Sequence, residues 1–335
     1  MPKERSNRAD AQRLFAAALD CLERGDPKRA LRLARNMDLL GFSGAFEIRA
    51  LVHIDRSQPD RAIAVLRKGI DKAPDSWRLW ELLGNLLSDS GRFDEAQTSY
   101  ERSLACPDTD RSTILYNSAI AYARQGLFER SLERLSGVSA SELAINASLL
   151  EASLLTSLKR TDEAIVIARQ VIARLTDPAA RQETADEDLA AAYSELARAH
   201  WEGRCDASEA LKTAWKALER GRRNFLAMRI VREARGRRSP RTRRWHCLMK
   251  GRWFEPFEGE SLIPGFFRNY EVLAESPLEC LEFVREFEPD LVRDTLEIES
   301  IKAVEDCPDE PRGLVAAEGY MFWEQDDSER PRVTN

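Results

Sequence analysis

The stretch that decides the fold of this chain is a spaced set of bulky and small residues: Trp80-x-x-Leu83-Gly84-x-x-Leu87, then Gly91, Ala96, Tyr100 and Ser103. Small residues at Gly84 and Ala96 let two helices approach closely, and large ones such as Trp80 and Tyr100 fill the gap to a neighbouring element. Gly91 marks the expected end of the first helix, because glycine adopts the left-handed conformation at little cost. The pattern predicts a hairpin of two short helices.

The same pattern recurs along the chain with a period of about 34 residues. Ala50 and Ala62 precede Gly84 and Ala96 by one period, and Ala119 and Ala164 continue the series downstream. Unrelated amphipathic helices would not keep glycine and alanine in phase over five units. A single hairpin cannot bury its apolar face, so the repeats are expected to stack into a solenoid. The sequence predicts five to six such hairpins.

These offsets resemble the tetratricopeptide repeat (TPR). The resemblance implies an all-α right-handed superhelix over residues 10–218, in which the first helix of each hairpin lines a concave groove for a protein or peptide partner. Each groove position could equally be a solvated surface residue. The groove residues that the resemblance indicates, taken position by position, are Glu47, Arg78, Glu81, Asn85, Asp89, Tyr116, Ile120, Arg124, Asn146 and Leu149.

Some TPR domains hold the C-terminal carboxylates of a partner with a clamp of lysine and asparagine. Asn85 occupies one clamp position here, but Glu81 stands where a lysine is needed. This departure argues against recognition of a carboxylate tail. The mixture of Arg78, Arg124, Tyr116 and acidic residues suits an extended peptide or a helix with apolar anchors and polar edges.

The charge of the chain changes sharply after the repeats. Residues 219–252 contain thirteen basic and two acidic residues, whereas residues 253–335 contain 22 acidic and seven basic residues. Residues 219–242 are interpreted as a capping helix, 224–235, and a basic linker broken by Gly236 and Pro240. The basic segment could bind phosphates through Arg235, Arg237, Arg238, Arg241, Arg243 and Arg244. Internal pairing with the acidic part that follows is the favoured interpretation.

Residues 243–325 are expected to form a small α+β domain, one antiparallel sheet with a helix on one face. Strands are predicted at residues 245–253, 266–274, 296–304 and 313–323, because apolar residues there are continuous or alternate. A helix is predicted at 278–287, with Ser276 as its cap. The tail, residues 326–335, is expected to be disordered.

Motifs for catalysis or for binding a cofactor or metal are missing from the sequence, which lacks phosphate-binding glycine loops, zinc motifs and a nucleophile elbow. His53 and His200 fall on repeat packing positions, and His246 and Cys247 would point to opposite faces of a strand. The acidic pairs Glu286/Glu288 and Glu297/Glu299 are expected to be structural or solvated. The chain is therefore predicted not to be an enzyme.

The amino-acid composition and the cysteine content indicate a cytoplasmic location. It is 43% hydrophobic and 32% charged, no run approaches the ~20 apolar residues of a membrane span, and the first ten residues are polar. The six cysteines are scattered, as expected of reduced thiols in a cytoplasm. Arginine strongly outnumbers lysine, which hints at a GC-rich bacterial genome.

The predicted function is a cytoplasmic adaptor, with the C-terminal domain as a second contact or a lid over the groove. The alternative is association with nucleic acid through residues 220–252.

Overall fold

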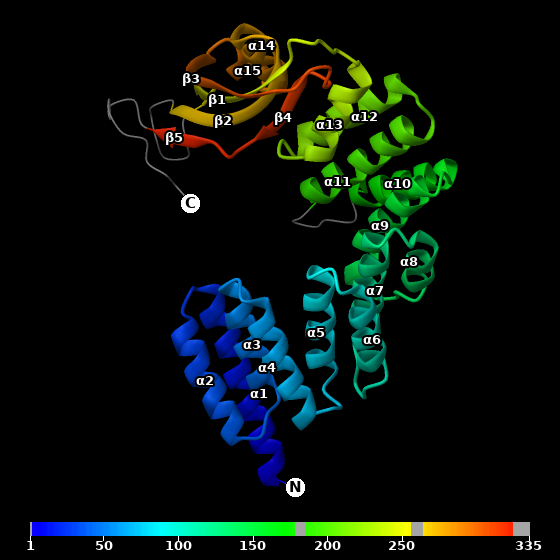
Figure 1. The fold of residues 1–335 in the computed structure, drawn as a ribbon, viewed down its shortest axis with the longest axis vertical. Coiled ribbons are helices and arrows are strands. Elements are labelled where there is room, and N and C mark those ends of the chain that lie inside the picture. Colours follow the sequence, from blue (N-terminus) through cyan, green and yellow to red (C-terminus); the bar gives the residue numbers. More distant parts are fainter. Residues whose placement is uncertain (1, 178–184, 256–263, 324–335) are drawn as a thin grey trace. The chain divides into compact units, whose positions relative to one another are not determined.

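Helical hairpins follow one another through the first part of the chain (Figure 1). The computed structural model describes residues 2–177, 185–255 and 264–323, and the chain divides into two compact units, unit 1 (residues 1–150) and unit 2 (residues 151–335). The helices of unit 1 are α1 (Pro2–Glu23), α2 (Pro27–Leu39), α3 (Gly44–Asp55), α4 (Pro59–Lys72), α5 (Trp77–Asp89), α6 (Phe93–Leu104), α7 (Arg111–Arg124) and α8 (Phe128–Leu135).

The hairpins of unit 1 stack so that their first helices form one surface. Each of α1, α3, α5 and α7 contacts the second helix of its own hairpin, and α1 contacts α3, α3 contacts α5 and α5 contacts α7. We call the surface formed by these four helices the A-helix face. A short 3-10 turn (Ser141–Leu143) leads into α9 (Ala144–Ser157), which crosses the boundary between the units.

The predicted glycines and small residues hold these hairpins together. Gly25, Gly91 and Gly126 end first helices with φ of 71°, 72° and 75°, in the left-handed region that side chains disfavour. Gly84 lies against the ring of Tyr100, so closely that an added Cβ would sit 2.6 Å from the nearest ring carbon. The distance between α5 and α6 therefore depends on the missing side chain at Gly84.

Unit 2 begins with further helices: α10 (Thr161–Thr176), α11 (Ala185–Arg198), a π-helical turn (Ala199–Gly203), α12 (Ala207–Arg220) and α13 (Phe225–Arg235). The α13 helix is capped by Asn224, whose side chain accepts a hydrogen bond from the Ala227 amide. Met228, Ile230 and Val231 are buried, whereas Phe225 is 61% exposed. Phe225 lies in the first turn of the helix, ahead of the buried stripe.

An antiparallel sheet follows, with strand order β3-β1-β2-β4 and β5 also paired to β2. Its helix α14 begins after Ser276, which caps the Glu279 amide as predicted, and α14 contacts β2, β3 and β4. The sequence predicted one last strand over 313–323, which is wrong: the strand ends at Ala317 and a second begins at Met321, so two short strands result. The elements are β1 (Arg243–Arg252), β2 (Gly265–Ala274), α14 (Pro277–Phe287), α15 (Asp290–Arg293), β3 (Glu297–Asp306), β4 (Gly313–Ala317) and β5 (Met321–Trp323).

The helices and the sheet of unit 2 share one apolar core, to which α12 and α13 contribute together with the strands and α14. Within this unit Glu288 is completely buried, so of the two expectations for this residue, structural or solvated, the structural one applies. Arg268 Nη1 lies 2.5 Å from its Oε1, and the hydroxyls of Tyr270 and Tyr320 donate to its two oxygens. The domain limits at 218, 242 and 325 remain predictions, and the tail 326–335 lies outside the described residues.

His200 occupies the π-helical turn and is 2% exposed, with neither ring nitrogen hydrogen-bonded to a described residue. Burial lowers its pKa below the ordinary 6.5, and Arg169 and Arg204 lower it further, while Glu209 and Asp206 oppose them. The sequence placed His200 at a packing position, and its burial confirms this. The neutral ring is the form that the fold accommodates.

We expect Gly84→Ala to lower the free energy of unfolding of unit 1 by about 1–3 kcal/mol, because the new methyl group would overlap the Tyr100 ring. Urea denaturation followed by circular dichroism measures this change. In a Tyr100→Leu background the same substitution should cost much less, since the ring is gone. Equal losses in both backgrounds would show that the Tyr100 contact does not set the helix spacing.

We expect stability to fall as the pH drops below about 6.5, because unfolded His200 gains a proton before the buried ring does. The contribution is fully present above the unfolded pKa and is lost as the pH approaches the depressed folded pKa. Urea denaturation at pH 7.5 and 5.5 should show a smaller acid-induced loss in His200→Phe than in the wild type. The substitution His246→Phe, at an exposed histidine, should show the same acid-induced loss as the wild type. If His200→Phe loses as much stability as the wild type, His200 is not the cause of the pH dependence.

Candidate functional site

The A-helix face carries a row of polar side chains on α5. Arg78, Glu81, Asn85 and Asp89 are spaced three and four residues apart, which places them along one stripe of the helix. The opposite side of α5 is buried, with Leu79, Leu83, Leu86 and Leu87 in the core. The apolar half fixes the helix in the stack and leaves the polar stripe available for other contacts.

Three polar contacts join this stripe to the neighbouring first helices. Arg78 Nη1 lies 3.7 Å from Oε1 of Glu47 on α3, and Glu81 accepts a hydrogen bond of 3.0 Å from the side-chain amide of Asn117 on α7. Arg124 on α7 donates to Asp89 at 2.6 Å. The structure thus brings together Glu47, Arg78 and Glu81 at one part of the face, and Asp89 with Arg124 at another.

Other predicted groove residues lie on the same helices. Asn85 accepts a 2.8 Å hydrogen bond from the hydroxyl of Tyr100, while Tyr116 and Ile120 on α7 are half-buried. Asn146 is exposed and Leu149 half-buried on α9. Their participation in a binding site stays a prediction. The sequence did not single out Asn117, which follows Tyr116 directly, although an amide beside an acidic stripe is a signal that could have found it.

Burial changes the acidity of the carboxylates on this face. The side chain of Glu47 is 15% exposed, and this burial raises its pKa to about 7, with a smaller increase from Glu81 and a decrease from Arg78. Burial also raises the pKa of Glu81, which Arg78 again opposes. The charge of Arg78 therefore opposes the effect of burial on two carboxylates, those of Glu47 and Glu81. A shift of this size at Glu47 corresponds to about 3 kcal/mol of unfavourable interaction when the group is ionised.

Tyrosine hydroxyls on the same side of unit 1 stay protonated. Burial raises the pKa of Tyr100, and the charges of Asp89 and Glu81 raise it further. Burial alone raises the pKa of Tyr116. Both hydroxyls are therefore neutral hydrogen-bonding groups at any physiological pH, and Tyr116 presents an amphipathic side chain of the kind that anchors protein partners.

The basic segment is largely paired within unit 2. Arg241 lies 2.7 Å from Glu275, and Arg243 and Arg244 each reach a carboxylate across the sheet. Arg238 donates to the main-chain oxygen of Asp309, and the guanidinium of Arg237 lies over the ring of Phe283. The ion pairs are Arg235–Glu286, Arg241–Glu275, Arg243–Asp306, Arg244–Glu271 and Arg244–Glu305.

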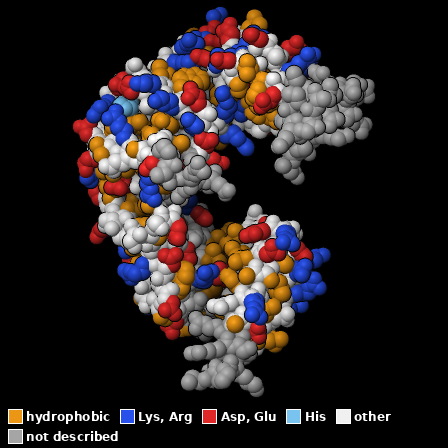
Figure 2. Space-filling model, turned by 180° about the vertical axis from the view of Figure 1, so that it is seen from behind, with side chains coloured by type: hydrophobic (Ala, Val, Ile, Leu, Met, Phe, Trp, Pro, Cys, Tyr) orange, Lys and Arg blue, Asp and Glu red, His pale blue; other side chains and the backbone are white. Residues whose placement is uncertain are grey.

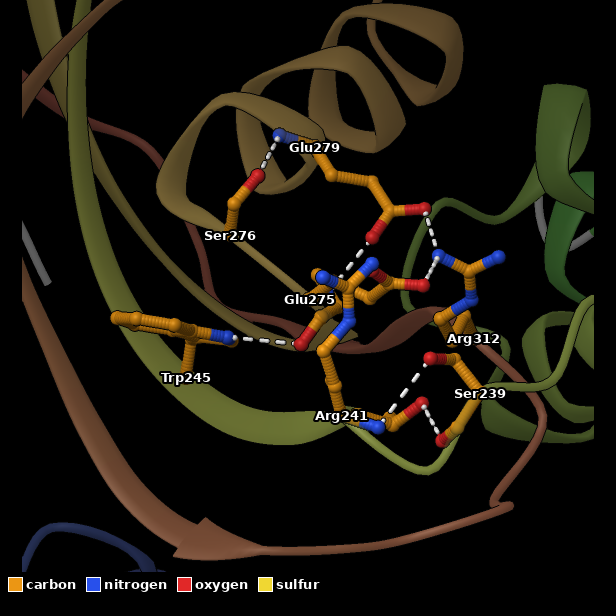
Figure 3. A network of polar contacts seen from close by, with 9 residues as sticks. Ser239, Arg241, Trp245, Glu275, Ser276, Glu279 and Arg312 are labelled. Atoms are coloured by element: carbon orange, nitrogen blue, oxygen red, sulfur yellow. Dashed lines mark hydrogen bonds and ion pairs between the residues drawn. The ribbon is translucent and has the colours of Figure 1, made fainter.

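One part of this pairing is a closed network around Glu275 and Glu279 (Figure 3). Arg312 Nη1 donates to both carboxylates, at 2.9 and 2.6 Å, while Arg241 binds Glu275 from the other side. Glu279 also accepts the Glu275 amide at 2.7 Å. On the surface of unit 2 seen in Figure 2, basic and acidic side chains are interspersed. The favoured interpretation, internal pairing of the basic segment, is confirmed.

Among the described residues, no three or more His, Cys, Asp or Glu side chains are placed to hold a metal ion. Cys247 is buried while His246 is exposed, so the two do not form a pair. Glu297 and Glu299 are exposed and lie near Lys250, as expected of a solvated strand face. Within the described ranges, no helix has the length and apolar character to cross a membrane.

Comparison with known proteins identifies the repeats. Residues 49–111 and 82–133 match a family model described as the tetratricopeptide repeat. A search of curated proteins finds no match to the chain. Among solved structures, PilW, described as a widely conserved type IV pilus biogenesis factor, aligns with a TM-score of 0.52 and 17% identity, covering 67% of this chain and 97% of that one.

Two further structures align similarly. PilF of Pseudomonas aeruginosa gives a TM-score of 0.50 with 16% identity, over 66% of this chain and 96% of its own. The Cut9–Hcn1 hetero-tetramer of the APC/C gives 0.51 with 14% identity, over 67% of this chain and 42% of that chain. At these identities the similarity concerns the fold.

We expect Arg235→Glu to lower the free energy of unfolding of unit 2 by about 1–3 kcal/mol, because it places two carboxylates together where Arg235 now pairs with Glu286. Adding Glu286→Arg should restore part of the loss. Urea denaturation measures both effects. Arg223→Glu, an exposed residue of the same segment, should change stability by less than about 0.5 kcal/mol. Failure of the swapped pair to recover any stability would show that this ion pair does not hold the segment.

Proposed function

Because this chain carries tetratricopeptide repeats followed by a small antiparallel sheet, we propose that it is a non-catalytic adaptor that binds a segment of a protein partner on the A-helix face of unit 1. The observation that carries the proposal is the pair of desolvated carboxylates, Glu47 and Glu81, on that face. Burial raises the pKa of both side chains and so disfavours their ionised forms, and carboxylates with pKa values perturbed in this way gather at functional sites.

The neighbouring residues supply the other parts of a binding surface. Tyr116 and Ile120 provide half-buried apolar area, while Asn85 and Asn117 hold hydrogen-bonding groups in fixed positions. Arg124, paired with Asp89, is half-exposed and marks a polar edge. Apolar anchors within a polar surround are the usual anatomy of a peptide-binding surface. Because these side chains lie on stacked helices, little ordering is needed when a partner binds.

We further propose that the sheet of unit 2 is a second contact, and that the protein works in the cytoplasm. The second proposal draws on the cysteines: all six are free thiols, including Cys247 and Cys280 in the core of unit 2, a pattern typical of a reducing compartment.

The test is affinity co-purification from native cell extract, with and without nuclease, using wild type and the double variant Tyr116→Ala/Arg124→Glu. We expect a stoichiometric partner that resists nuclease and is lost in the double variant, because its apolar anchor and its polar edge are gone. The control is Arg102→Glu, an exposed residue on the second helix α6, which should retain the partner. A partner that the double variant retains would contradict the proposal.

The second candidate function, association with nucleic acid through residues 220–252, predicts a different result. Nuclease-sensitive material would be recovered, and Arg237→Glu/Arg238→Glu would abolish its binding. These two arginines suit the test because, within the described residues, neither forms an ion pair with a carboxylate. Circular dichroism of the double variant checks that unit 2 still folds, because Arg238 donates to the main-chain oxygen of Asp309 and Arg237 lies over the Phe283 ring.

A further inference from the structure

A pocket opens beside Glu47, where α1 and α3 meet α5 and the α2–α3 loop. Its volume is about 160 Å³, which is room for the end of one long side chain. Phe15 and Phe42 line it, with their rings edge to face and the ring centroids 6.1 Å apart. Ser43 and Ser76, whose hydroxyl oxygens are 3.3 Å apart, also line the pocket, together with Glu47.

The chemistry of this pocket suits a cation. Aromatic ring faces attract ammonium and guanidinium groups, and a desolvated carboxylate binds them through short, charge-assisted hydrogen bonds. Within the described part of the chain, the Glu47 carboxylate accepts no hydrogen bond; its one ion pair, with Arg78, has an N–O distance of 3.7 Å. The Glu47 carboxylate, the strongest acceptor in the pocket, can therefore still accept hydrogen bonds from a bound cation.

The position of Arg78 supports the same conclusion from inside the molecule. Its guanidinium lies 5.8 Å from the centre of the Phe15 ring and 5.1 Å from that of Trp77, and its side chain is 53% exposed. Arg78 is thus drawn toward the pocket without entering hydrogen-bond distance of Glu47. Glu81 lies nearby as well, so Arg78 is shared between two carboxylates.

We propose that this pocket receives an arginine or lysine side chain from the partner segment that occupies the A-helix face. The inference rests on the proposed function and adds the chemistry of one anchor. The incoming cation stacks on Phe15 and Phe42 and donates hydrogen bonds to Glu47. Arg78 competes with the incoming cation for Glu47 from the edge of the pocket. Arg78 therefore lowers the affinity of the pocket for the partner.

Proton release accompanies this binding. Free Glu47 has a pKa of about 7, with Arg78 and Glu81 as its charged neighbours, so it is partly protonated at neutral pH. A cation in the pocket favours the ionised form and lowers that pKa. Binding at pH 7 should therefore release a fraction of a proton, and affinity should rise from pH 6 to pH 8.

The experiment begins with a library of random twelve-residue displayed peptides, selected on the full chain. A selected peptide is then synthesised with its basic residue intact and with citrulline, the neutral analogue of arginine, in that place. Titration calorimetry at pH 6 and 8, and at pH 7 in two buffers of different ionisation enthalpy, measures affinity and proton release. Circular dichroism confirms that each variant is folded.

We expect citrulline to weaken binding about tenfold or more at pH 8, and less at pH 6. Glu47→Gln should weaken the basic peptide to the level of the citrulline peptide and remove proton release, whereas Arg78→Met should strengthen binding. Glu129→Gln, an exposed carboxylate on α8, is the matched control and should change nothing.

The remaining outcomes separate the two proposals. Peptides that lack a basic anchor but lose binding in Tyr116→Ala/Arg124→Glu would overturn the cation pocket and leave the adaptor function standing. Weaker binding in Arg78→Met would also overturn it, because Arg78 would then contact the partner directly. Peptides that are indifferent to the double variant, or a selection that yields none, would overturn the proposed function and the pocket with it.

Discussion

The contact between Gly84 and Tyr100 illustrates the constraint on which the repeat part of this protein depends. Two helices can pack at close range only where one side supplies a residue with almost no side chain, and Gly84, Ala50 and Ala119 provide that in successive hairpins. Once the second helices fix the first helices in this way, the outward stripe of each first helix stays outside the apolar core. On α5 this stripe consists of polar residues, and their contacts reach the neighbouring first helices.

Two glutamates that the fold removes from water, Glu288 and Glu47, differ in how far hydrogen bonds compensate for their burial. Glu288 in unit 2 is completely enclosed, yet Arg268, Tyr270 and Tyr320 all bind its oxygens, so its burial is fully compensated. Glu47 in unit 1 is largely but not completely buried, and the nearest nitrogen of Arg78, with which it forms an ion pair, stays beyond hydrogen-bond distance at 3.7 Å. With a total stability of about 5–15 kcal/mol typical of folded domains, an uncompensated carboxylate is a substantial loss. Binding a cationic partner is the event that would recover it.

The sequence predicted the parts of the fold that depend on local patterns. The hairpins, their glycine ends and the Ser276 cap follow from residue type and spacing, and all are present. The break between β4 and β5 was missed, because the largely apolar letters of 313–323 do not show where pairing with β2 is interrupted. The burial of Glu288 was missed because its partners come from elsewhere in the chain, Arg268 and Tyr270 from β2 and Tyr320 from the link between β4 and β5.

The candidate site was predictable only in outline. Repeat register places Glu47, Glu81 and Arg124 on first helices, but only tertiary packing decides which carboxylate loses water. The pocket beside Glu47 needs Phe15 from α1 and Phe42 from a loop, and neither residue stands at a groove position of the repeat. A pocket of this kind is formed by residues of different repeats, so the residue pattern within a single repeat does not predict it.

The basic segment shows why a count of charges is a poor guide to partners. Thirteen basic residues in a short stretch would release many counterions if they met phosphates, but Arg235, Arg241, Arg243 and Arg244 are already engaged by carboxylates of the same unit. A phosphate would have to replace those carboxylates, so most of the electrostatic gain is cancelled. The shared core strengthens the argument, because α13 packs with the sheet and carries its arginines into that contact. The charge asymmetry of the chain is therefore best understood as part of what joins the last helices to the sheet.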